Sequence, residues 1–438
     1  MNIAFYTLGC KVNQYETQVM REAFANAGYN TVSHSGGFDI IIVNSCTVTA
    51  ESDRKTRQSV RRFRRERPDS IIILTGCMVQ AFPENADILP EADIITGNTD
   101  ISHLTELVDR FLRDGERVVE ISSHKPKERF NTPPIMRFDE RTRAYMKIED
   151  GCDRFCSYCI IPTARGRVRS KPLSEISSEA ESLAANGFSE IVLVGINLSS
   201  YGKNEDFDLC DAVDAVCNIP NVKRVRLGSL EPDYITDEML CRLKKQDKFC
   251  PQFHLSLQSG CDETLKRMNR HYDTAFYSDL VKRIRDIFDD AAITTDVMVG
   301  FAGETDEEFK KSLDFVKETG FAKTHVFAYS RRAGTVAYGL PCQVSGAEKT
   351  RRSGLMIAAC AESERAFLRA HIGTVTDVLF ETAENGFAEG YTKNYIRVKV
   401  KSDKSYTGEI LKVKITDASD EFCTGRLIAI ENSVLGGQ

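Results

Sequence analysis

Short apolar runs alternate with longer amphipathic stretches over residues 1–121. Runs rich in isoleucine and valine predict buried parallel strands at residues 2–8, 39–44, 70–75 and 92–96. Residues 14–27 have the pattern of a helix that ends before Gly28, a residue type favoured just beyond a helix C-terminus. This alternation of strands and helices predicts right-handed crossovers and a doubly wound α/β domain.

The same alternation returns over residues 143–370. A polar stretch with two Lys and a Pro–Pro pair, residues 122–142, precedes it and is expected to be a linker. Six parallel strands with intervening helices favour a (β/α)6 partial barrel, although periodicity alone leaves a flat sheet open. The predicted strands lie at residues 144–148, 190–194, 224–227, 252–257, 293–299 and 323–328.

Residues 371–438 have a different pattern. Apolar and polar residues alternate in short runs at residues 374–380, 396–401 and 410–415, and no helical pattern stands out. We therefore expect a small, OB-like β-barrel as a third domain.

The composition is that of a globular protein, with 42% hydrophobic and 28% charged residues in a chain of 438. The longest apolar runs have strand length, and the first residues lack the basic start and apolar core of a signal peptide, so neither a membrane span nor secretion is expected. Fourteen cysteines then indicate a reducing compartment, the cytoplasm, and metal or thiol chemistry. The net charge of −6 excludes a uniformly basic nucleic-acid coat but allows a local basic patch.

Three cysteines, Cys152, Cys156 and Cys159, stand together directly after the first predicted barrel strand. At this spacing their thiolates can hold a compact 4Fe-4S cluster, and a set of three leaves one iron open for another ligand. The loop follows a barrel strand at its carboxyl end, where barrel enzymes have their active sites. A structural zinc site is the alternative, but such sites close with four ligands and no further Cys or His follows nearby.

This loop, with Tyr158 before its last cysteine, resembles the signature of the radical S-adenosylmethionine (SAM) superfamily. The resemblance implies that the open iron binds SAM, whose reductive cleavage gives methionine and a 5′-deoxyadenosyl radical. It also implies SAM contacts, most of them at the ends of successive strands, at Tyr158, Gly195, Asn197, Glu231, Gln258, Ser259, Gly300 and Arg332.

A second set of cysteines is spread through the first domain. Cys10, Cys46 and Cys77 each follow directly on a predicted strand, two of them after a glycine. Parallel strands bring their carboxyl ends to one edge of a sheet, so the three thiols are expected to converge there. Cysteine is also a common buried hydrophobe, which is the alternative interpretation. Their shared placement favours an auxiliary 4Fe-4S site, again with one iron open.

A strongly basic tract spans residues 54–67, where eight Lys or Arg residues stand against one Glu. A charge run is usually a solvated helix face, but this one lies between two predicted cluster ligands in an otherwise acidic chain. A phosphate backbone close to the site would explain it. We therefore predict RNA contacts at Arg54, Arg57, Arg61, Arg62 and Arg65.

The alternation over residues 391–401 suggests a second RNA-binding surface. If the apolar residues 396, 398 and 400 face the barrel core, the residues between them share one outer face. Cations interleaved with an aromatic ring suit RNA by phosphate pairing and base stacking, although an ordinary amphipathic strand has the same pattern. The predicted contacts are Tyr395, Arg397 and Lys399.

Taken together, the three segments resemble the radical SAM methylthiotransferase family over nearly the whole chain. The resemblance implies an N-terminal cluster domain, a radical SAM core and a C-terminal TRAM domain that binds RNA. The opening tract TLGCKVNQYET at residues 7–17, with residues 44–49, 257–260 and 329–335, is similar to the MtaB-type branch.

That branch acts on tRNA. The resemblance implies conversion of N6-threonylcarbamoyladenosine at position 37, beside the anticodon, to its 2-methylthio form. It implies two 4Fe-4S clusters, SAM as methyl donor and radical source, the anticodon stem-loop as partner, and a reductant protein such as flavodoxin or ferredoxin.

Other functions stay open on the sequence. A methylthiotransferase of the same family could act on isopentenyladenosine in tRNA or on a ribosomal protein. A radical SAM oxidoreductase whose auxiliary cluster only relays electrons belongs to another class, as does a non-catalytic RNA-binding protein with structural clusters. Transfer of sulfur to a product would separate the first group from the other two.

Overall fold

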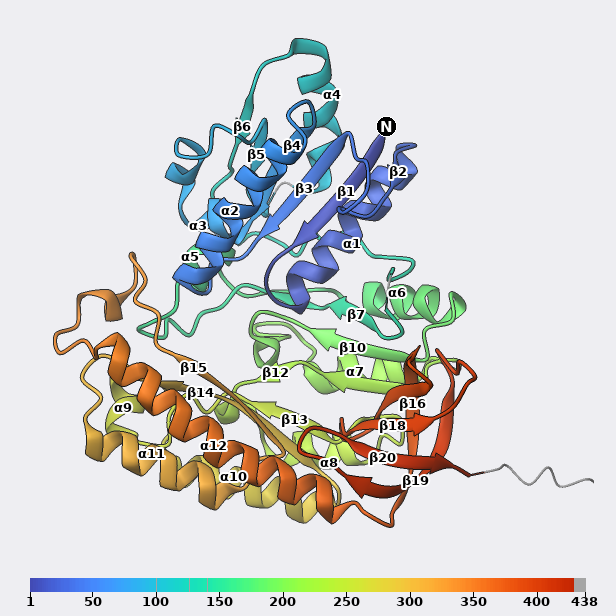
Figure 1. Cartoon of the computed structure of the whole chain (residues 1–438), viewed down its shortest axis with the longest axis vertical. Coiled ribbons are helices and arrows are strands. Elements are labelled where there is room, and N and C mark those ends of the chain that lie inside the picture. The colour runs from blue at the N-terminus through green and yellow to red at the C-terminus, as the bar shows by residue number, and fades with distance from the viewer. Residues whose placement is uncertain (100, 126, 140, 429–438) are drawn as a thin grey trace, which may run out of the picture.

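The computed structural model of the chain describes residues 1–99, 101–125, 127–139 and 141–428. Residues 126 and 140 of the expected linker and residues 429–438 of the expected TRAM domain lie outside the described residues. Three units surround a central hollow: an α/β domain at the top of Figure 1, a large α/β barrel below it and a small β-barrel at its side. None of the described helices is long and apolar enough to cross a membrane.

Four strands of the N-terminal sheet lie where buried strands were predicted, and the two short edge strands, at Asn30–Thr31 and Val118–Glu120, were not predicted. Its six parallel strands run in the order β2-β1-β3-β4-β5-β6. Helices α1 (Lys11–Asn26) and α4 (Leu104–Asp114) pack on one face, and α2 (Ala50–Glu66) and α3 (Cys77–Ala81) on the other. The doubly wound fold is therefore confirmed. The strands are β1 (Asn2–Thr7), β2 (Asn30–Thr31), β3 (Ile40–Ser45), β4 (Ile71–Gly76), β5 (Ile94–Thr96) and β6 (Val118–Glu120).

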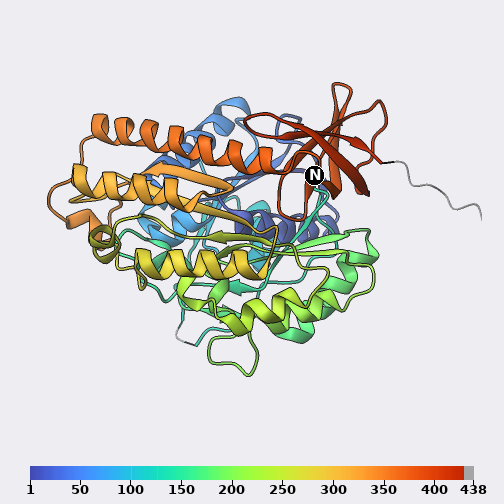
Figure 2. The ribbon, with the colours of Figure 1, turned by 90° about the horizontal axis from the view of Figure 1, so that it is seen from below.

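The central unit is a partial barrel of parallel strands, as predicted, but its wall is split into two sheets, β11-β10-β7 and β12-β13-β14-β15. Most of its helices lie outside the strands (Figure 2): α6 (Leu173–Ala185), α7 (Leu209–Cys217), α8 (Asp237–Lys244), α10 (Thr274–Ile287), α11 (Asp306–Thr319) and α12 (Gly346–Ala370). The strands are β7 (Ala144–Lys147), β10 (Glu190–Val194), β11 (Arg224–Leu227), β12 (Ser229–Leu230), β13 (Gln252–Leu255), β14 (Ala292–Val299) and β15 (Lys323–Ala328).

The C-terminal unit is a closed five-stranded barrel, which confirms the third prediction. Ile396, Val398 and Val400 are buried in its core, as their alternation predicted. The strand order is β16-β17-β18-β20-β19, closed by a parallel pairing of β18 with β20. The strands are β16 (Val375–Glu384), β17 (Phe387–Thr392), β18 (Arg397–Lys401), β19 (Ile410–Ala418) and β20 (Cys423–Leu427).

Arginines of the central barrel hold the small barrel in place. Arg224 and Arg226 project from β11 and are fully buried. The Arg224 guanidinium donates to the carbonyls of Asp377 and Tyr391 at 2.7 and 2.9 Å. That of Arg226 donates to the carbonyls of residues 392 and 393. Arg143 adds an ion pair to Glu381 of β16.

Candidate active site between the three domains

The three cysteines of the N-terminal domain converge at one edge of its sheet. Cys10 precedes α1, Cys46 follows β3, and Cys77 begins α3 directly after β4. The Asn13 Oδ1 atom lies 3.6 Å from the Cys10 Sγ and 4.0 Å from the Cys77 Sγ. Gly9, at φ +111°, passes so close to Cys46 that a Cβ at this position would be 3.2 Å from its Sγ. The predicted convergence is therefore confirmed.

The donor set at this edge fits an iron–sulfur cluster. Cys46 and Cys77 are buried, and burial raises the pKa of the Cys77 thiol to about 12. A buried thiolate needs a cation beside it, which iron in a cluster provides. Arg165 lowers this cost at one ligand, because its Nε–H donates to the Cys77 Sγ at 3.1 Å. Cys10 alone of the three is exposed.

The second cysteine set lies in the loop between β8 (Glu149–Asp150) and α5 (Ile161–Arg165). The loop is compact: the Cys159 N–H donates to the Cys156 carbonyl at 3.0 Å, and Phe155 adopts φ +50°. Burial raises the pKa of Cys152 and of Cys159 to about 12. Arg270 lies with its Nη1 3.2 Å from the Cys156 Sγ. Three buried or half-buried thiols beside a fixed cation also fit a cluster with three protein ligands.

Several residues expected to contact SAM carry polar atoms that are buried and lack a hydrogen-bond partner among the described residues. These atoms are the Asn197 Oδ1, the Gln258 Oε1 and the Ser259 Oγ. Buried polar groups are normally satisfied, so unsatisfied ones beside the cysteine loop favour a polar ligand there. Backbone strain supports this, since Gln258 is held at φ +68°.

The other expected SAM contacts differ in what holds them. Gly195 has no room for a side chain, because a Cβ would meet the Glu149 Oε2 at 2.5 Å. Glu231 accepts hydrogen bonds from the Arg270 guanidinium, which neutralises its charge. The Tyr158 ring packs edge-on against Phe301 at 6.3 Å between ring centroids. Gly300 adopts φ +69°, a conformation that favours glycine.

Arg332 has another set of partners. Its guanidinium donates to Asp53 at 2.7 Å and to the Thr47 hydroxyl at 2.5 Å, and the side chain is buried. Both partners belong to the N-terminal domain, and Asp53 lies in α2. Arg332 therefore joins the two domains, while its expected contact with SAM stays a prediction.

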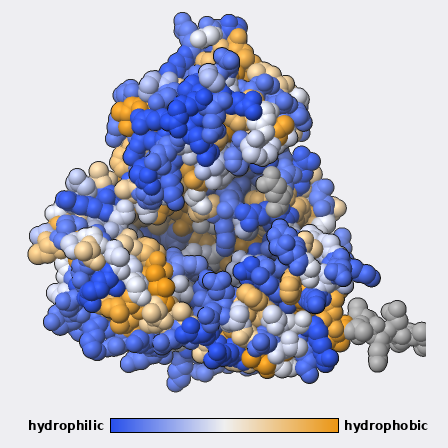
Figure 3. Space-filling view, in the orientation of Figure 1, coloured by the Kyte–Doolittle hydropathy of each residue, from blue (hydrophilic) through white to orange (hydrophobic). Residues whose placement is uncertain are grey.

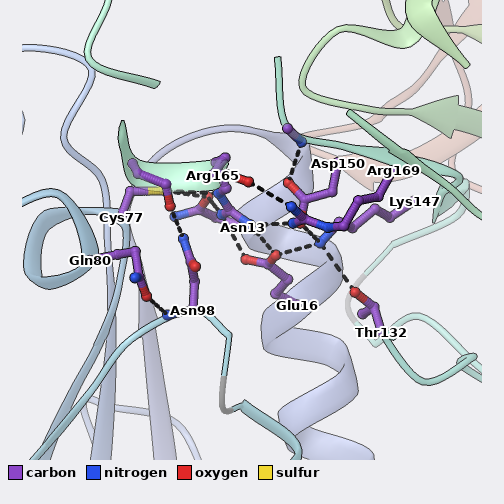
Figure 4. Close-up of polar contacts among 12 residues, drawn as sticks. Asn13, Glu16, Cys77, Gln80, Asn98, Thr132, Lys147, Asp150, Arg165 and Arg169 are labelled. Carbon is purple, nitrogen blue, oxygen red and sulfur yellow. Dashed lines mark hydrogen bonds and ion pairs between the residues drawn. The ribbon is translucent and has the colours of Figure 1, made fainter. Parts of the chain in front are cut away.

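A network of buried charges joins the same two domains behind Cys77 (Figure 4). Arg165 pairs with Glu16 of α1 and also donates to the Asn13 Oδ1 at 3.0 Å. Lys147 of β7 pairs with Glu16 at 2.8 Å and with Asp150 at 2.6 Å. The cations lower the pKa of Glu16 against the effect of burial. Arg165 connects this network to the Cys77 Sγ. Arg165 itself lies in α5, the helix that directly follows the loop of the second cysteine set.

A cavity of about 930 Å³ lies between the three domains, where Figure 3 shows a hollow. Cys10 and Lys11 line it from the N-terminal domain, and Tyr395 from the small barrel. The central barrel contributes Gly195 and inward-facing residues of its later strands. The volume is in the range of ligand sites.

Polar side chains inside the barrel were not singled out from the sequence. His254, Asp296 and His325 line the cavity, and their ligand atoms lie within 4.8 Å of one another. The His254 Nε2 is 3.4 Å from Asp296, while its Nδ1 shares a hydrogen bond with Thr294. Burial lowers the pKa of His325. Histidine and aspartate on strands that were predicted to lie in the barrel wall were the signal that could have identified them.

The predicted basic tract forms α2, whose outer face belongs to the hydrophilic surface at the upper left of Figure 3. Some of its charges are already paired: Arg54 with Glu51, and Arg61 with Glu91. The Arg62 guanidinium lies over the Phe63 ring at 4.6 Å from its centroid. Arg57 and Arg65 have no ion pair among the described residues and extend along the same stripe of the helix.

One detail of the C-terminal prediction is wrong. Tyr395 does not share the outer face of β18 with Arg397 and Lys399, because it lies in the turn before this strand at φ +71°. Its ring stacks on Tyr391 at 4.9 Å between centroids and faces the guanidinium groups of the central barrel. Arg397 and Lys399 do lie on one face and share Glu389 as a partner.

The barrel, the three-cysteine loop at the carboxyl end of its first strand and the unsatisfied polar atoms beside it define a radical SAM enzyme. Residues 146–316 match the model of the Radical SAM superfamily, and residues 2–97 match that of uncharacterized protein family UPF0004. The fold is similar to that of the radical SAM methyltransferase TsrM from Kitasatospora setae, with a TM-score of 0.56 and 14% identity over 77% of this chain and 73% of that one.

Curated relatives extend the match to nearly the full length. The threonylcarbamoyladenosine tRNA methylthiotransferase MtaB of Bacillus subtilis is 35% identical over 98% of this chain and 96% of its own. The tRNA-2-methylthio-N(6)-dimethylallyladenosine synthase of Symbiobacterium thermophilum is 34% identical over 96% and 93%. The chain belongs to the radical SAM methylthiotransferase family. SAM and a 4Fe-4S cluster are the cofactors that this membership implies.

Proposed function

We propose that this enzyme converts N6-threonylcarbamoyladenosine at tRNA position 37 to its 2-methylthio derivative. Cys152, Cys156 and Cys159 would hold the radical SAM cluster, and Cys10, Cys46 and Cys77 an auxiliary 4Fe-4S cluster. A flavodoxin or ferredoxin would supply electrons, and the anticodon stem-loop would be the part of the tRNA that is bound. The relatives named for this substrate are 33–35% identical to the chain, slightly more than the 31–34% of relatives named for the dimethylallyl base, which favours this choice by a small margin.

One observation carries the proposal. The cavity of about 930 Å³ is lined by Cys10 of the N-terminal cysteine set, by Gly195 at the end of a barrel strand and by Tyr395 of the small barrel. A base extruded from an RNA loop into this cavity would lie between Cys10 of the auxiliary site and Gly195, which is one of the expected SAM contacts. An enzyme that adds a methylthio group needs both sites to reach one substrate atom.

When bound, the clusters and SAM supply the methyl group, the sulfur and the radical chemistry. The protein's own groups prepare the site for them. Asn197, Gln258 and Ser259 offer unsatisfied polar atoms to a polar ligand. Arg270 neutralises Glu231 and fixes the Cys156 side of the loop, and Arg165 fixes Cys77.

The decisive experiment is mass spectrometry of tRNA nucleosides from host cells with and without the gene for this chain. We expect 2-methylthio-N6-threonylcarbamoyladenosine only when the gene is present, with a matching fall in the unmethylthiolated nucleoside. Appearance of 2-methylthio-isopentenyladenosine instead would assign the other branch of the family. An unchanged nucleoside profile would favour an electron-relay role for the second cluster.

Binding of the stem-loop should depend on the unpaired cations of α2. Replacing Arg57 and Arg65 by Glu should weaken RNA binding and flatten the dependence of log affinity on log salt, by about 0.7 to 0.9 for each phosphate that the helix no longer neutralises. The matched control changes Arg110 and Arg113 of α4, which pair with Glu120 and Asp114, to Glu as well. Filter binding over a salt series measures both. Equal slopes for the two variants would mean that α2 is only solvated surface.

A further inference from the structure

One end of the central cavity carries a lysine side chain that has no ion-pair partner among the described residues. Lys11 lines the cavity beside Cys10 and is exposed to it, while the surrounding protein lowers the pKa of its ammonium group. The other Lys and Arg side chains that line the cavity are paired, Lys323 with Glu364 and Arg397 with Glu389. No carboxylate lies within ion-pair distance of Lys11 among the described residues. The side chain instead lies over the Tyr145 ring, 5.9 Å from its centroid.

The surroundings of Lys11 add positive charge. Arg143 and Arg226 flank the Tyr395 ring, at 5.0 and 4.7 Å from its centroid. Together with burial these two cations lower the pKa of Lys11, and the neighbouring Tyr395 hydroxyl opposes that shift. Glu381 pairs with Arg143, and Glu190 pairs with Arg226 and Arg224, so neither carboxylate is an ion-pair partner of Lys11 in the described part of the chain. Helix α1 begins at Lys11 with no side-chain cap and no acidic residue in its first turn. The positive end of the helix dipole therefore faces the same place.

An anion of the substrate would satisfy this charge. The two adenosines named for the relatives differ in their N6 substituent: the threonylcarbamoyl group carries a carboxylate and a hydroxyl, whereas the dimethylallyl group is apolar. Sequence identity hardly separates them, at 33–35% against 31–34%. A cavity with an unpaired ammonium group stabilises a carboxylate and disfavours an alkyl group that would leave the charge unsatisfied.

We propose that Lys11 binds the threonyl carboxylate of the substrate base and so selects threonylcarbamoyladenosine over dimethylallyladenosine. The inference rests on the function proposed above. It places the substituent on N6 next to Cys10, at the mouth of the auxiliary site. Tyr395 and the arginines behind it form the wall of the same subsite.

The test measures the coupling between Lys11 and the carboxylate. Reconstituted holoenzyme is titrated with a fluorescent anticodon stem-loop that carries threonylcarbamoyladenosine, and with the same RNA in which the carboxylate is converted to the primary amide. Wild type should bind the acid roughly 10- to 100-fold more tightly than the amide, the range for a charge-assisted hydrogen bond. Lys11→Met should bind both RNAs about equally, and Lys11→Arg should keep most of the preference.

The outcomes separate the two proposals. If Lys11→Met keeps the wild-type preference for the acid, Lys11 does not bind the carboxylate, although the reaction can still be as proposed. If wild type binds the threonylcarbamoyl stem-loop no better than one with unmodified adenosine, the proposed substrate itself is wrong. Iron content and cluster absorption show whether each variant is intact. The comparison of acid and amide on wild type needs no variant, and equal affinities there overturn the inference directly.

Discussion

A variant with alanine at Cys10, Cys46 and Cys77 should make no methylthiolated nucleoside but should still cleave SAM to 5′-deoxyadenosine. The reason is the separation of the two cysteine sets, which lie on different domains with different neighbours. Iron content should fall from about eight per chain to about four, the content of one cubane. Anaerobic reconstitution, iron analysis and chromatography of the nucleosides measure all three effects.

The companion variant should lose the SAM cleavage that the first variant keeps. Alanine at Cys152, Cys156 and Cys159 should remove one cluster, SAM cleavage and product together. Cys241→Ala and Cys342→Ala are the controls, because both cysteines are exposed and lie outside the two sets. They should keep the full iron content. Methylthiolated product from the first variant would reduce the N-terminal cysteines to a structural or electron-relaying role.

Glu16→Ala should be the most destabilising change at the contact between the N-terminal domain and the barrel. Glu16 is 1% exposed and forms ion pairs with both Lys147 and Arg165. Its removal leaves two buried cations with one fewer partner, which typically costs about 3–5 kcal/mol. Hydrogen exchange followed by mass spectrometry should show faster exchange in α1 and α5, the helices that the network joins.

An exposed ion pair provides the control for this change. Lys310 and Asp314 pair one helical turn apart on α11 and are exposed to solvent. Such pairs contribute about 0–1 kcal/mol, so Lys310→Ala should leave hydrogen exchange almost unchanged. An equal response in the two variants would show that the domains are held by their apolar contacts and not by the buried charges.

The positions of the strands and the convergence of the cysteines could be predicted from the sequence, because both follow from residues that are neighbours along the chain. A run of apolar residues identifies a buried strand, and parallel strands must bring the residues that follow them to one edge. That reasoning was sufficient to predict the convergence of Cys10, Cys46 and Cys77. It also predicted the inward alternation of Ile396, Val398 and Val400.

Contacts between domains could not be predicted in the same way. Arg165 and Tyr395 have local patterns typical of a helix end and of a strand start. Their actual roles depend on the surface that another domain presents to them, which no local periodicity encodes. The left-handed conformation of Tyr395 turns its ring away from the face that strict alternation predicts. Lys11 is next in sequence to Cys10, a proposed cluster ligand. The absence of a carboxylate around Lys11, among the residues that the structure describes, depends on all three domains.

The buried arginines between the two barrels fix the position of the small barrel relative to the central one. Arg224 and Arg226 are buried and donate to main-chain carbonyls of the small barrel, so that barrel cannot move away without leaving these charged groups unsatisfied. The distance from the small barrel to the cavity is therefore set by architecture, not by a flexible tether. An RNA held by the small barrel would present only the nucleotide that lies at this distance, whatever the surrounding sequence.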